Sequence, residues 1–525
     1  MKKISIDKVK NWEFYYLLCL IGLVGIFRSN FWNEHLLNID EMVYTHMLQR
    51  VKEFSMPFAG VETFTSGPVL VYFLSIIHFF TDYPSLTAIR IFQFFCTIVP
   101  SFFLLYYVSE KPARLFAVSF FFFFLITFSY PQQVRIGSQF GIYDDYLSFN
   151  TEYVLMVEIG LMYYLQVAFR PSKWVIFFFS VLLWLSFFTK SQAVLFVGYF
   201  CIKFANDVIK KRLKSFGFYV LVNSILGLSL IGFLIITGTF SSFYIQYIQK
   251  NFLYADLSTF GSFYPSIVFI IKSHEIHWLV FLLVGGYFFK KHFGQLQERL
   301  LQRKFLDPLL LLLVTLLTLY VSKNHYFHYK VLLFFPMSLM FGQLCQVFIT
   351  KKREVLFSIC FLMGLSNLLL FFGCYNQVKN YFLHKIKEPV AGIAPLSIDD
   401  AQIGQAEKKQ VVAYLQSKYK PGDHLLIFGQ VIALGMYYEL LKSYQPAWRS
   451  ANSAYLEDYV ARKDWVKYEE EEGALLHDLS QTPPRFIVDT DQFVEMWLTR
   501  RLRRYFTARY QLVLKTQKIT VWELK

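Results

Sequence analysis

The acidic pair Asp40-Glu41 stands where the sequence passes from an apolar segment into a mixed one. The residues after it recur at helical spacing on one apolar side, namely Val43, Met47, Val51 and Phe54. Such a helix would lie along a membrane surface and place both carboxylates where lipid meets water. A carboxylate there can act as a general base. Asp40 can equally cap the helix N-terminus, with Glu41 as a neighbour that the helix dipole favours.

A second group of acids, Asp144, Asp145 and Glu152, lies within nine positions at the start of another apolar segment, and Arg135 precedes it in the same loop. Charged groups in this position are costly unless they face water or a ligand. The sequence therefore predicts a polar site here. The alternative is that Asp144 or Asn150 only caps the following helix.

Two shorter segments carry cations between apolar stretches. Lys190 has almost no loop around it, so it either binds a phosphate or extends its amine to the lipid headgroups. His325, His328 and Tyr329 occupy a later loop with no Cys or Glu at metal-ligand spacing, which favours binding of an anion or a headgroup over a metal ion.

The composition assigns the chain to the polytopic membrane proteins. Hydrophobic residues make up 55% of its 525 residues, with 60 Phe and 35 Tyr. The net charge of +15 comes mostly from short basic clusters between apolar segments, which is how membrane proteins fix their orientation, so nucleic acid is rejected as a partner. The six cysteines show neither a disulfide framework nor metal-ligand spacing.

About eleven membrane spans are predicted. They cover roughly 14–30, 86–108, 114–130, 150–169, 173–189, 191–206, 216–239, 266–289, 305–321, 329–349 and 353–375. The apolar stretch 67–80 is too short to cross and is expected to lie in the interface. With the N-terminus in the cytoplasm, the basic clusters, including 210–214 and 351–353, then all fall on the inner side. The acids, Lys190 and the histidine loop share the outer side.

We expect two domains. Residues 1–375 form a membrane domain with an interfacial first outer loop at 31–85, and residues 376–525 form a small α/β domain outside the cytoplasmic membrane. The predicted elements of the second domain are helices at 410–418 and around 434–441, a turn at 421–423, and strands at 425–428, 486–489, 510–514 and 519–524. No Gly-rich phosphate loop occurs in the sequence.

Taken in order, these segments resemble the GT-C superfamily of polyprenyl-phosphate-sugar glycosyltransferases, in particular bacterial relatives of the protein O-mannosyltransferases and the aminoarabinose transferases (glycosyltransferase family 39 and similar). The segments that carry the resemblance are Asp40-Glu41 with the following helix, 60–70, Asp144-Asp145 with Glu152, Thr189-Lys190, His328-Tyr329 with Pro336, and the α/β tail. One departure is Ser66-Gly67-Pro68, where many relatives have Glu-Lys-Pro.

The resemblance implies an inverting transfer of a sugar from a polyprenyl-phosphate donor to a glycan, lipid or protein acceptor, at the outer face of the cytoplasmic membrane. Asp40, with Glu41 beside it, would be the catalytic base. The other roles that it implies are acceptor or sugar binding by Asp144, Asp145 and Glu152, and donor-phosphate binding by Lys190, Arg135, His328 and Tyr329.

The sequence leaves one question about the reaction and three rival functions open. A divalent cation could assist the reaction, although no metal site is predicted. A transporter or flippase of lipid-linked saccharides is a rival, but no internal repeat is found. A non-catalytic assembly subunit is another, and a membrane-bound acyltransferase would leave the first acidic loop unexplained.

Overall fold

The computed structural model describes most of the helical part of the chain and most of its C-terminal part. The described residues are 11–28, 41, 44–48, 51, 58, 67–81, 85–110, 113–128, 150–211, 213–249, 251, 303–321, 327–348, 398–428, 436, 439–440, 443–446, 465–490 and 500–525. The predicted spans at 266–289 and 353–375 lie outside these residues.

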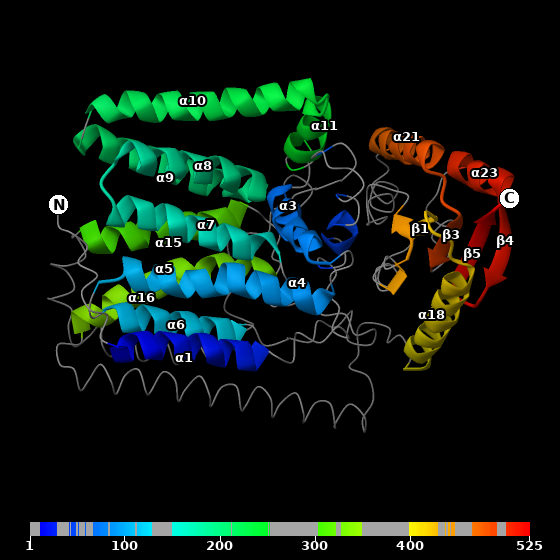
Figure 1. Cartoon of the computed structure of the whole chain (residues 1–525), viewed down its shortest axis with the longest axis horizontal. Helices are drawn as coiled ribbons and strands as arrows, with labels where there is room; N and C mark the ends of the chain where they lie inside the picture. The colour runs from blue at the N-terminus through cyan, green and yellow to red at the C-terminus, as the bar shows by residue number, and fades with distance from the viewer. Residues whose placement is uncertain are drawn as a thin grey trace.

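Long helices lie side by side and form a bundle (Figure 1). They are α1 (Asn11–Arg28), α4 (Leu86–Gln93) with α5 (Val99–Val108), α6 (Ala113–Phe128), α7 (Thr151–Ala168), α8 (Lys173–Thr189), α9 (Val194–Lys211), α10 (Leu213–Ile236), α15 (Arg303–Val321) and α16 (Val331–Phe348). Each coincides with a predicted span. Short elements join them, namely η5 (Ser191–Ala193), α11 (Phe240–Phe243), η6 (Tyr244–Gln249) and η7 (Phe327–Lys330).

Three segments within the described residues are long and apolar enough to cross a membrane: Leu86–Val108, Ser191–Lys210 and Ser215–Ile236. The stretch that we expected not to cross forms α3 (Val69–Ser75) and the 3-10 turn η2 (Ile76–Phe79), and α3 lies at an angle to the long helices (Figure 1). Together they fall into the group of shorter apolar helices of 10–17 residues.

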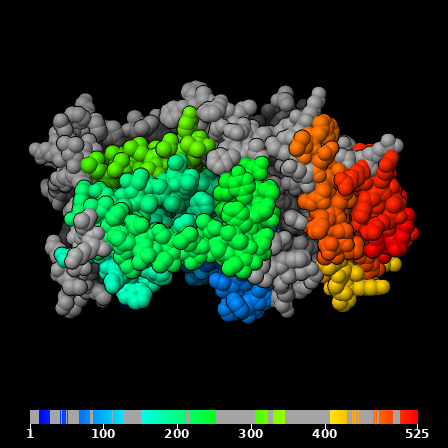
Figure 2. All heavy atoms as spheres, turned by 90° about the horizontal axis from the view of Figure 1, so that it is seen from above, coloured from blue at the N-terminus to red at the C-terminus, as the bar shows by residue number. Residues whose placement is uncertain are grey.

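Aromatic side chains fill the bundle and apolar side chains also cover its outside. Phe102 and Phe121 are fully buried, and their rings meet edge to face at 4.8 Å. On α10, in contrast, Leu228 is 70% exposed and Ile236 is 86% exposed. Figure 2 shows α10 in green on the face seen from above. A helix that presents large apolar side chains to its surroundings suits contact with lipid.

The segment Leu86–Val108 is not a regular α-helix throughout. A π-helix, η3 (Phe94–Ile98), separates α4 from α5, and Pro100 follows directly. Proline has no N–H and its ring would clash with the carbonyl group four residues earlier, so the wider turn accommodates it. This turn also sets the direction of α4, which carries two residues of the candidate site.

The C-terminal part contains a five-stranded sheet. Its strands are β1 (His424–Phe428), β2 (Gln445–Pro446), β3 (Phe486–Thr490), β4 (Tyr510–Lys515) and β5 (Ile519–Leu524), in the order β2-β1-β3-β5-β4. The strand β1 is parallel to β2 and β3, whereas β5 is antiparallel to β3 and β4. The four predicted strands are therefore confirmed, with bounds shifted by one residue at most.

Helices cover both faces of this sheet (Figure 1). Leu425, Ile427 and Val488 face α18 (Ile398–Lys418) and contact its Val411 and Leu415. The alternate residues of the strands, such as Leu426 and Ile487, face α21 (Trp465–Gln481) and α23 (Arg500–Arg509). Because β1 and β3 are buried on both sides, they read as continuous apolar runs in the sequence.

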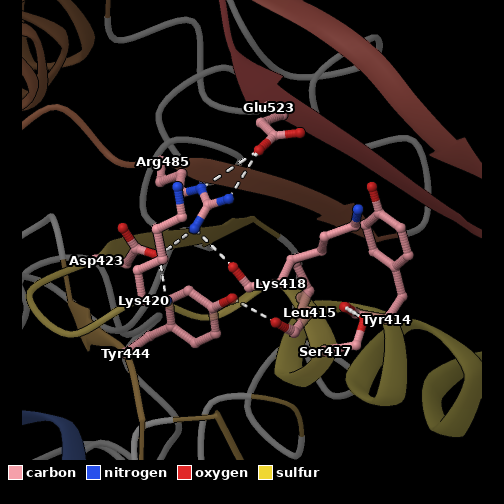
Figure 3. A network of polar contacts seen from close by, with 9 residues as sticks. All are labelled: Tyr414, Leu415, Ser417, Lys418, Lys420, Asp423, Tyr444, Arg485 and Glu523. Carbon is pink, nitrogen blue, oxygen red and sulfur yellow. Dashed lines mark hydrogen bonds and ion pairs between the residues drawn. The ribbon is translucent and has the colours of Figure 1, made fainter.

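Arg485, which directly precedes the central strand β3, forms hydrogen bonds to several elements of this domain (Figure 3). Arg485 donates to Asp423 at 2.6 Å, to the carbonyl oxygen of Lys418 at 2.6 Å and to Glu523 at 3.2 Å. Burial alone would lower the pKa of the Arg485 guanidinium, but Asp423 and Glu523 outweigh it and hold that pKa above its ordinary value. Arg485 therefore joins the end of α18, the turn before β1 and the strand β5.

Candidate active site

Segments that are far apart in the sequence meet at one end of the bundle, on the side of the C-terminal sheet (Figure 1). They are the short helix α4, the start of α7, the end of α8 and the segment η7 before α16. These are the ends from which the loops on one predicted face emerge. The contacts below show that their polar residues touch one another.

Lys190 is the centre of this meeting point. It follows the last residue of α8, has an extended backbone and is only 3% exposed. Its amine forms an ion pair with Glu152 at the start of α7 and lies 4.2 Å from the ring centroid of Tyr329. Lys190 thus points into the protein, and the prediction that it only extends to headgroups is wrong. The sequence predicted all three residues as site residues but did not predict these contacts.

Thr189, beside Lys190, is held by two further elements. Its hydroxyl donates to Oε1 of Glu158 on α7 at 2.7 Å. Its carbonyl oxygen accepts from the backbone N–H of Gly67 at 3.0 Å. The peptide that leads into Lys190 is therefore fixed by both α7 and the segment before α3.

The departure at Ser66-Gly67-Pro68 has a steric reason in this fold. A Cβ added to Gly67 would lie 1.6 Å from the carbonyl oxygen of Phe188. No side chain fits at that distance unless the backbone moves. A lysine at this position would therefore separate the segment before α3 from α8.

An aromatic cluster surrounds this close contact. Phe58, Phe188 and Tyr247 are buried together, and the ring of Phe188 is stacked on that of Tyr247 with centroids 6.0 Å apart. Phe58 has a positive φ of 64°, which is unfavourable for a residue with a side chain. Its ring meets that of Phe243 edge to face at 5.4 Å, and this packing holds the strained residue in place.

Glu41 is buried and paired. It is 1% exposed and accepts hydrogen bonds from Nε of Arg90 at 3.0 Å and 3.2 Å, with a further ion pair to the terminal nitrogen. Arg90 lies on α4, inside a predicted span, and is a residue of the site that was not predicted from the sequence. A lone arginine in an apolar segment was the signal, because such a residue needs a buried partner.

The helix after Glu41 is less exposed than predicted. Met47 and Val51 are buried against Leu70 and Leu74 of α3, in agreement with the apolar side of the pattern. His46, however, is fully buried as well. The described part of this segment is thus covered on more than one side, because α3 and α4 pack over it.

Two side-chain amides lie beside these ion pairs. Gln93, one helical turn after Arg90, donates from Nε2 to the carbonyl oxygen of Asn150 at 3.0 Å. Asn150 is the N-cap residue of α7, yet its side chain makes no capping hydrogen bond. The prediction that the Asn150 side chain caps this helix is therefore wrong, and Asp144 lies outside the described residues.

The remaining predicted site residues are not described at the level of their side chains. Asp40, Arg135, Asp144 and Asp145 lie outside the described residues, and His328 belongs to η7 by its backbone only. Among the residues that are described, no three His, Cys, Asp or Glu side chains come together in a way that could hold a metal ion.

The fold is that of the GT-C glycosyltransferases, as the resemblance of the sequence predicted. The structure of ArnT from Cupriavidus metallidurans bound to undecaprenyl phosphate superimposes with a TM-score of 0.55 and 9% identity, over 97% of both chains. The same protein in the apo state gives a TM-score of 0.51, 10% identity and the same coverage.

A weaker likeness, with a TM-score of 0.44 and 10% identity, is found to the archaeal oligosaccharyltransferase AglB from Archaeoglobus fulgidus in complex with an inhibitory peptide and a dolichol-phosphate. It covers 98% of this chain and 75% of that one. No family model and no curated protein sequence matches the chain.

Proposed function

We propose that this protein is an inverting glycosyltransferase that moves a sugar from a polyprenyl-phosphate donor to a hydroxyl group of a glycan, lipid or protein acceptor. The observation that carries the proposal is the buried Lys190, held between Glu152 and Tyr329 at the end of the bundle where Glu41 is paired with Arg90. The shared fold with ArnT, which has been solved with undecaprenyl phosphate, supports a lipid phosphate as ligand.

The proposed reaction is a single displacement. The acceptor oxygen forms a bond to the anomeric carbon while Asp40 takes the proton of the acceptor hydroxyl. The bond between the anomeric carbon and the phosphate oxygen breaks, and the electron pair leaves with the polyprenyl phosphate. The charge that develops on this leaving group requires a cation fixed in a poorly hydrated place.

Lys190 is suited to that role because it is buried and already oriented. In the structure its charge is balanced by Glu152 and by the face of the Tyr329 ring. A donor phosphate would replace Glu152 as the anion paired with Lys190. The Glu152 carboxylate could then accept a hydrogen bond from a hydroxyl group of the sugar or acceptor. Arg135 and His328 are further candidates for phosphate binding, and Asp144 and Asp145 for binding of hydroxyl groups.

Glu41 has a different proposed role from the one its neighbour Asp40 has. The Glu41 carboxylate is paired with the Arg90 guanidinium, so we do not assign to it the role of the base that takes the acceptor proton. We assign to it the positioning of Asp40, which precedes it by one residue. A helix start fixed by a bidentate ion pair gives the adjacent base a defined place.

The topology belongs to the same proposal. About eleven spans, a cytoplasmic N-terminus and an α/β domain of residues 376–525 outside the cytoplasmic membrane would bring the site to the outer headgroup level. There the phosphate of a lipid-linked sugar is found, because its polyprenyl chain stays in the membrane. A divalent cation would be an additional component, and chelation of divalent ions in the assay below tests for it.

The experiment is transfer of radiolabelled sugar from a panel of polyprenyl-phosphate sugars in proteoliposomes, with release of polyprenyl phosphate as readout. We expect release with one donor by the wild type and none above background with Asp40→Asn. Undiminished release by that variant would remove Asp40 as the base. A well-folded wild type that releases nothing from any donor would favour the transporter or the assembly subunit.

A further inference from the structure

Gln93 and Asn150 are a pair of buried residues whose side-chain amides have no task in the reaction above. They are 3% and 1% exposed. Within the described part of the chain, Oε1 of Gln93 and both polar atoms of the Asn150 amide have no hydrogen-bond partner. A buried polar group without a hydrogen-bond partner destabilises the folded state, so this arrangement opposes folding as long as no ligand supplies the missing bonds.

Local structure does not account for Asn150. It has the extended backbone of an N-cap residue, with φ −145° and ψ 175°, but its side chain does not accept from the first turn of α7. Ser172 at the start of α8 and Ser85 at the start of α4 occupy the same position and do accept such a bond, from Val175 and Ala88. The amide of Asn150 is thus left available where a cap is the normal use of the residue.

The pair lies next to the proposed reaction centre. Asn150 precedes Glu152, the partner of Lys190, by two residues. Gln93 follows Arg90, the partner of Glu41, by three residues and thus lies on the same side of α4. The hydrogen bond between Gln93 and Asn150 therefore connects the phosphate end of the site with the segment that carries the base.

The chemistry of the two amides selects the kind of ligand. An amide is uncharged and offers both N–H donors and an acceptor oxygen. A hydroxyl group also donates and accepts, so it satisfies such a pair, whereas a phosphate offers only acceptor oxygens and would face the amide oxygens unfavourably. We propose that Gln93 and Asn150 bind hydroxyl groups of the donor sugar. This assignment rests on the proposed function, because the phosphate at Lys190 would bring the sugar to them.

The test compares binding of two kinds of lipid to the purified full chain in nanodiscs. One is undecaprenyl phosphate, and the other is a panel of undecaprenyl-phosphate hexoses and pentoses. For the sugar that the wild type prefers, Asn150→Leu and Gln93→Leu should each lower the affinity about tenfold. Binding of undecaprenyl phosphate itself should not change, because Lys190 is intact.

Two measurements separate this role from a structural one. The melting temperature of Asn150→Leu should not fall, since its side chain makes no hydrogen bond that could be lost. A donor that lacks the contacted hydroxyl should bind equally to the wild type and the variant. Asn150→Ser, which can cap the helix, serves as a second variant, and its preference for the sugar should fall as well.

Gln166→Leu is the matched control. Gln166 is a buried amide on the same helix, about 24 Å further along by the rise of 1.5 Å per residue, and it donates to Asp207 at 3.1 Å. This variant should keep the preference for the sugar. An unchanged preference in Asn150→Leu and Gln93→Leu would overturn the inference, as would equal weakening for both kinds of lipid. A wild type that does not bind undecaprenyl phosphate would instead refute the proposed function.

Discussion

The backbone N–H of Gly67 donates to the carbonyl oxygen of Thr189 at 3.0 Å, and this bond ties the segment before α3 to the residue that precedes Lys190. The contact is so close that only glycine fits at position 67. The position of Lys190, which we propose to bind the donor phosphate, therefore depends on a residue without a side chain.

Gly67→Ala should separate the segment before α3 from the end of α8. The added Cβ would lie 1.6 Å from the carbonyl oxygen of Phe188, so we expect a loss of about 3 kcal/mol in stability and about 100-fold in transfer rate. Thermal unfolding and turnover in proteoliposomes measure the two. Gly198→Ala on α9 is the control, because no heavy atom of the described part lies within 4 Å of its added Cβ. Equal behaviour of both variants would show that the contact is dispensable.

Arg90→Met should leave the Glu41 carboxylate buried without its partner arginine. Breaking such a pair from one side costs about 3–5 kcal/mol, and the thermal unfolding of the purified chain should show this loss. The double variant Glu41→Met/Arg90→Met should regain most of the stability but little of the activity, since the start of the helix is no longer fixed. Full activity of the double variant would argue against the positioning role.

Lys190→Met should weaken the binding of undecaprenyl phosphate by about 10- to 100-fold, because a charge-assisted hydrogen bond to the phosphate is lost. Binding is measured with the chain in nanodiscs. The control is Lys203→Met, which removes another largely buried lysine, one that pairs with Asp307 at 2.8 Å and lies away from the site. Lys190 would lose its assigned role if both variants bound the lipid equally well.

Glu152→Gln should have the opposite effect on binding. The carboxylate of Glu152 balances the charge of Lys190 and would repel an arriving phosphate, so its removal should tighten the binding of undecaprenyl phosphate about tenfold. Transfer should nevertheless slow down, because the acceptor for a hydroxyl hydrogen bond is weaker. Weaker binding of the lipid by this variant would mean that Glu152 only orients Lys190.

Arg485→Lys should destabilise the C-terminal sheet by about 1–3 kcal/mol through lost hydrogen bonds to charged groups, although the charge is kept. A lysine amine cannot replace the separate guanidinium contacts to Asp423, Lys418 and Glu523. Hydrogen exchange in 398–525 reports the loss, which we expect at β1, β3 and β5. Arg504→Lys on the exposed side of α23 is the control and should leave the exchange unchanged.

Much of the fold could be predicted from the sequence because its signals are local. Apolar runs marked each helix of the bundle, and short apolar runs that follow turn residues marked the central strands of the sheet. The start of α18 at Ile398 was missed, since residues 398–409 are mostly polar and contain few large apolar residues that could indicate a helix. The π-helix was missed as well, although Pro100 was visible in the sequence.

The site could be predicted only in part. Residue types picked out Glu152, Lys190 and Tyr329, but which of them meet depends on packing between distant segments. Arg90 and Gln93 were read as ordinary members of a span, and the tight approach at Gly67 was read as a missing lysine. In each case the decisive partner, such as Glu41 or the Phe188 carbonyl group, is far away in sequence.

The short helix α4 carries Arg90 and Gln93 on one turn, and through them it holds both the segment of the proposed base and the start of α7. Spans change their tilt when the hydrocarbon layer becomes thicker or thinner, and groups on separate spans then shift against each other. Groups held by a single turn of one helix move together. We therefore expect the spacing between Glu41 and the start of α7 to depend little on bilayer thickness, and transfer to vary little between membranes of short-chain and long-chain lipids.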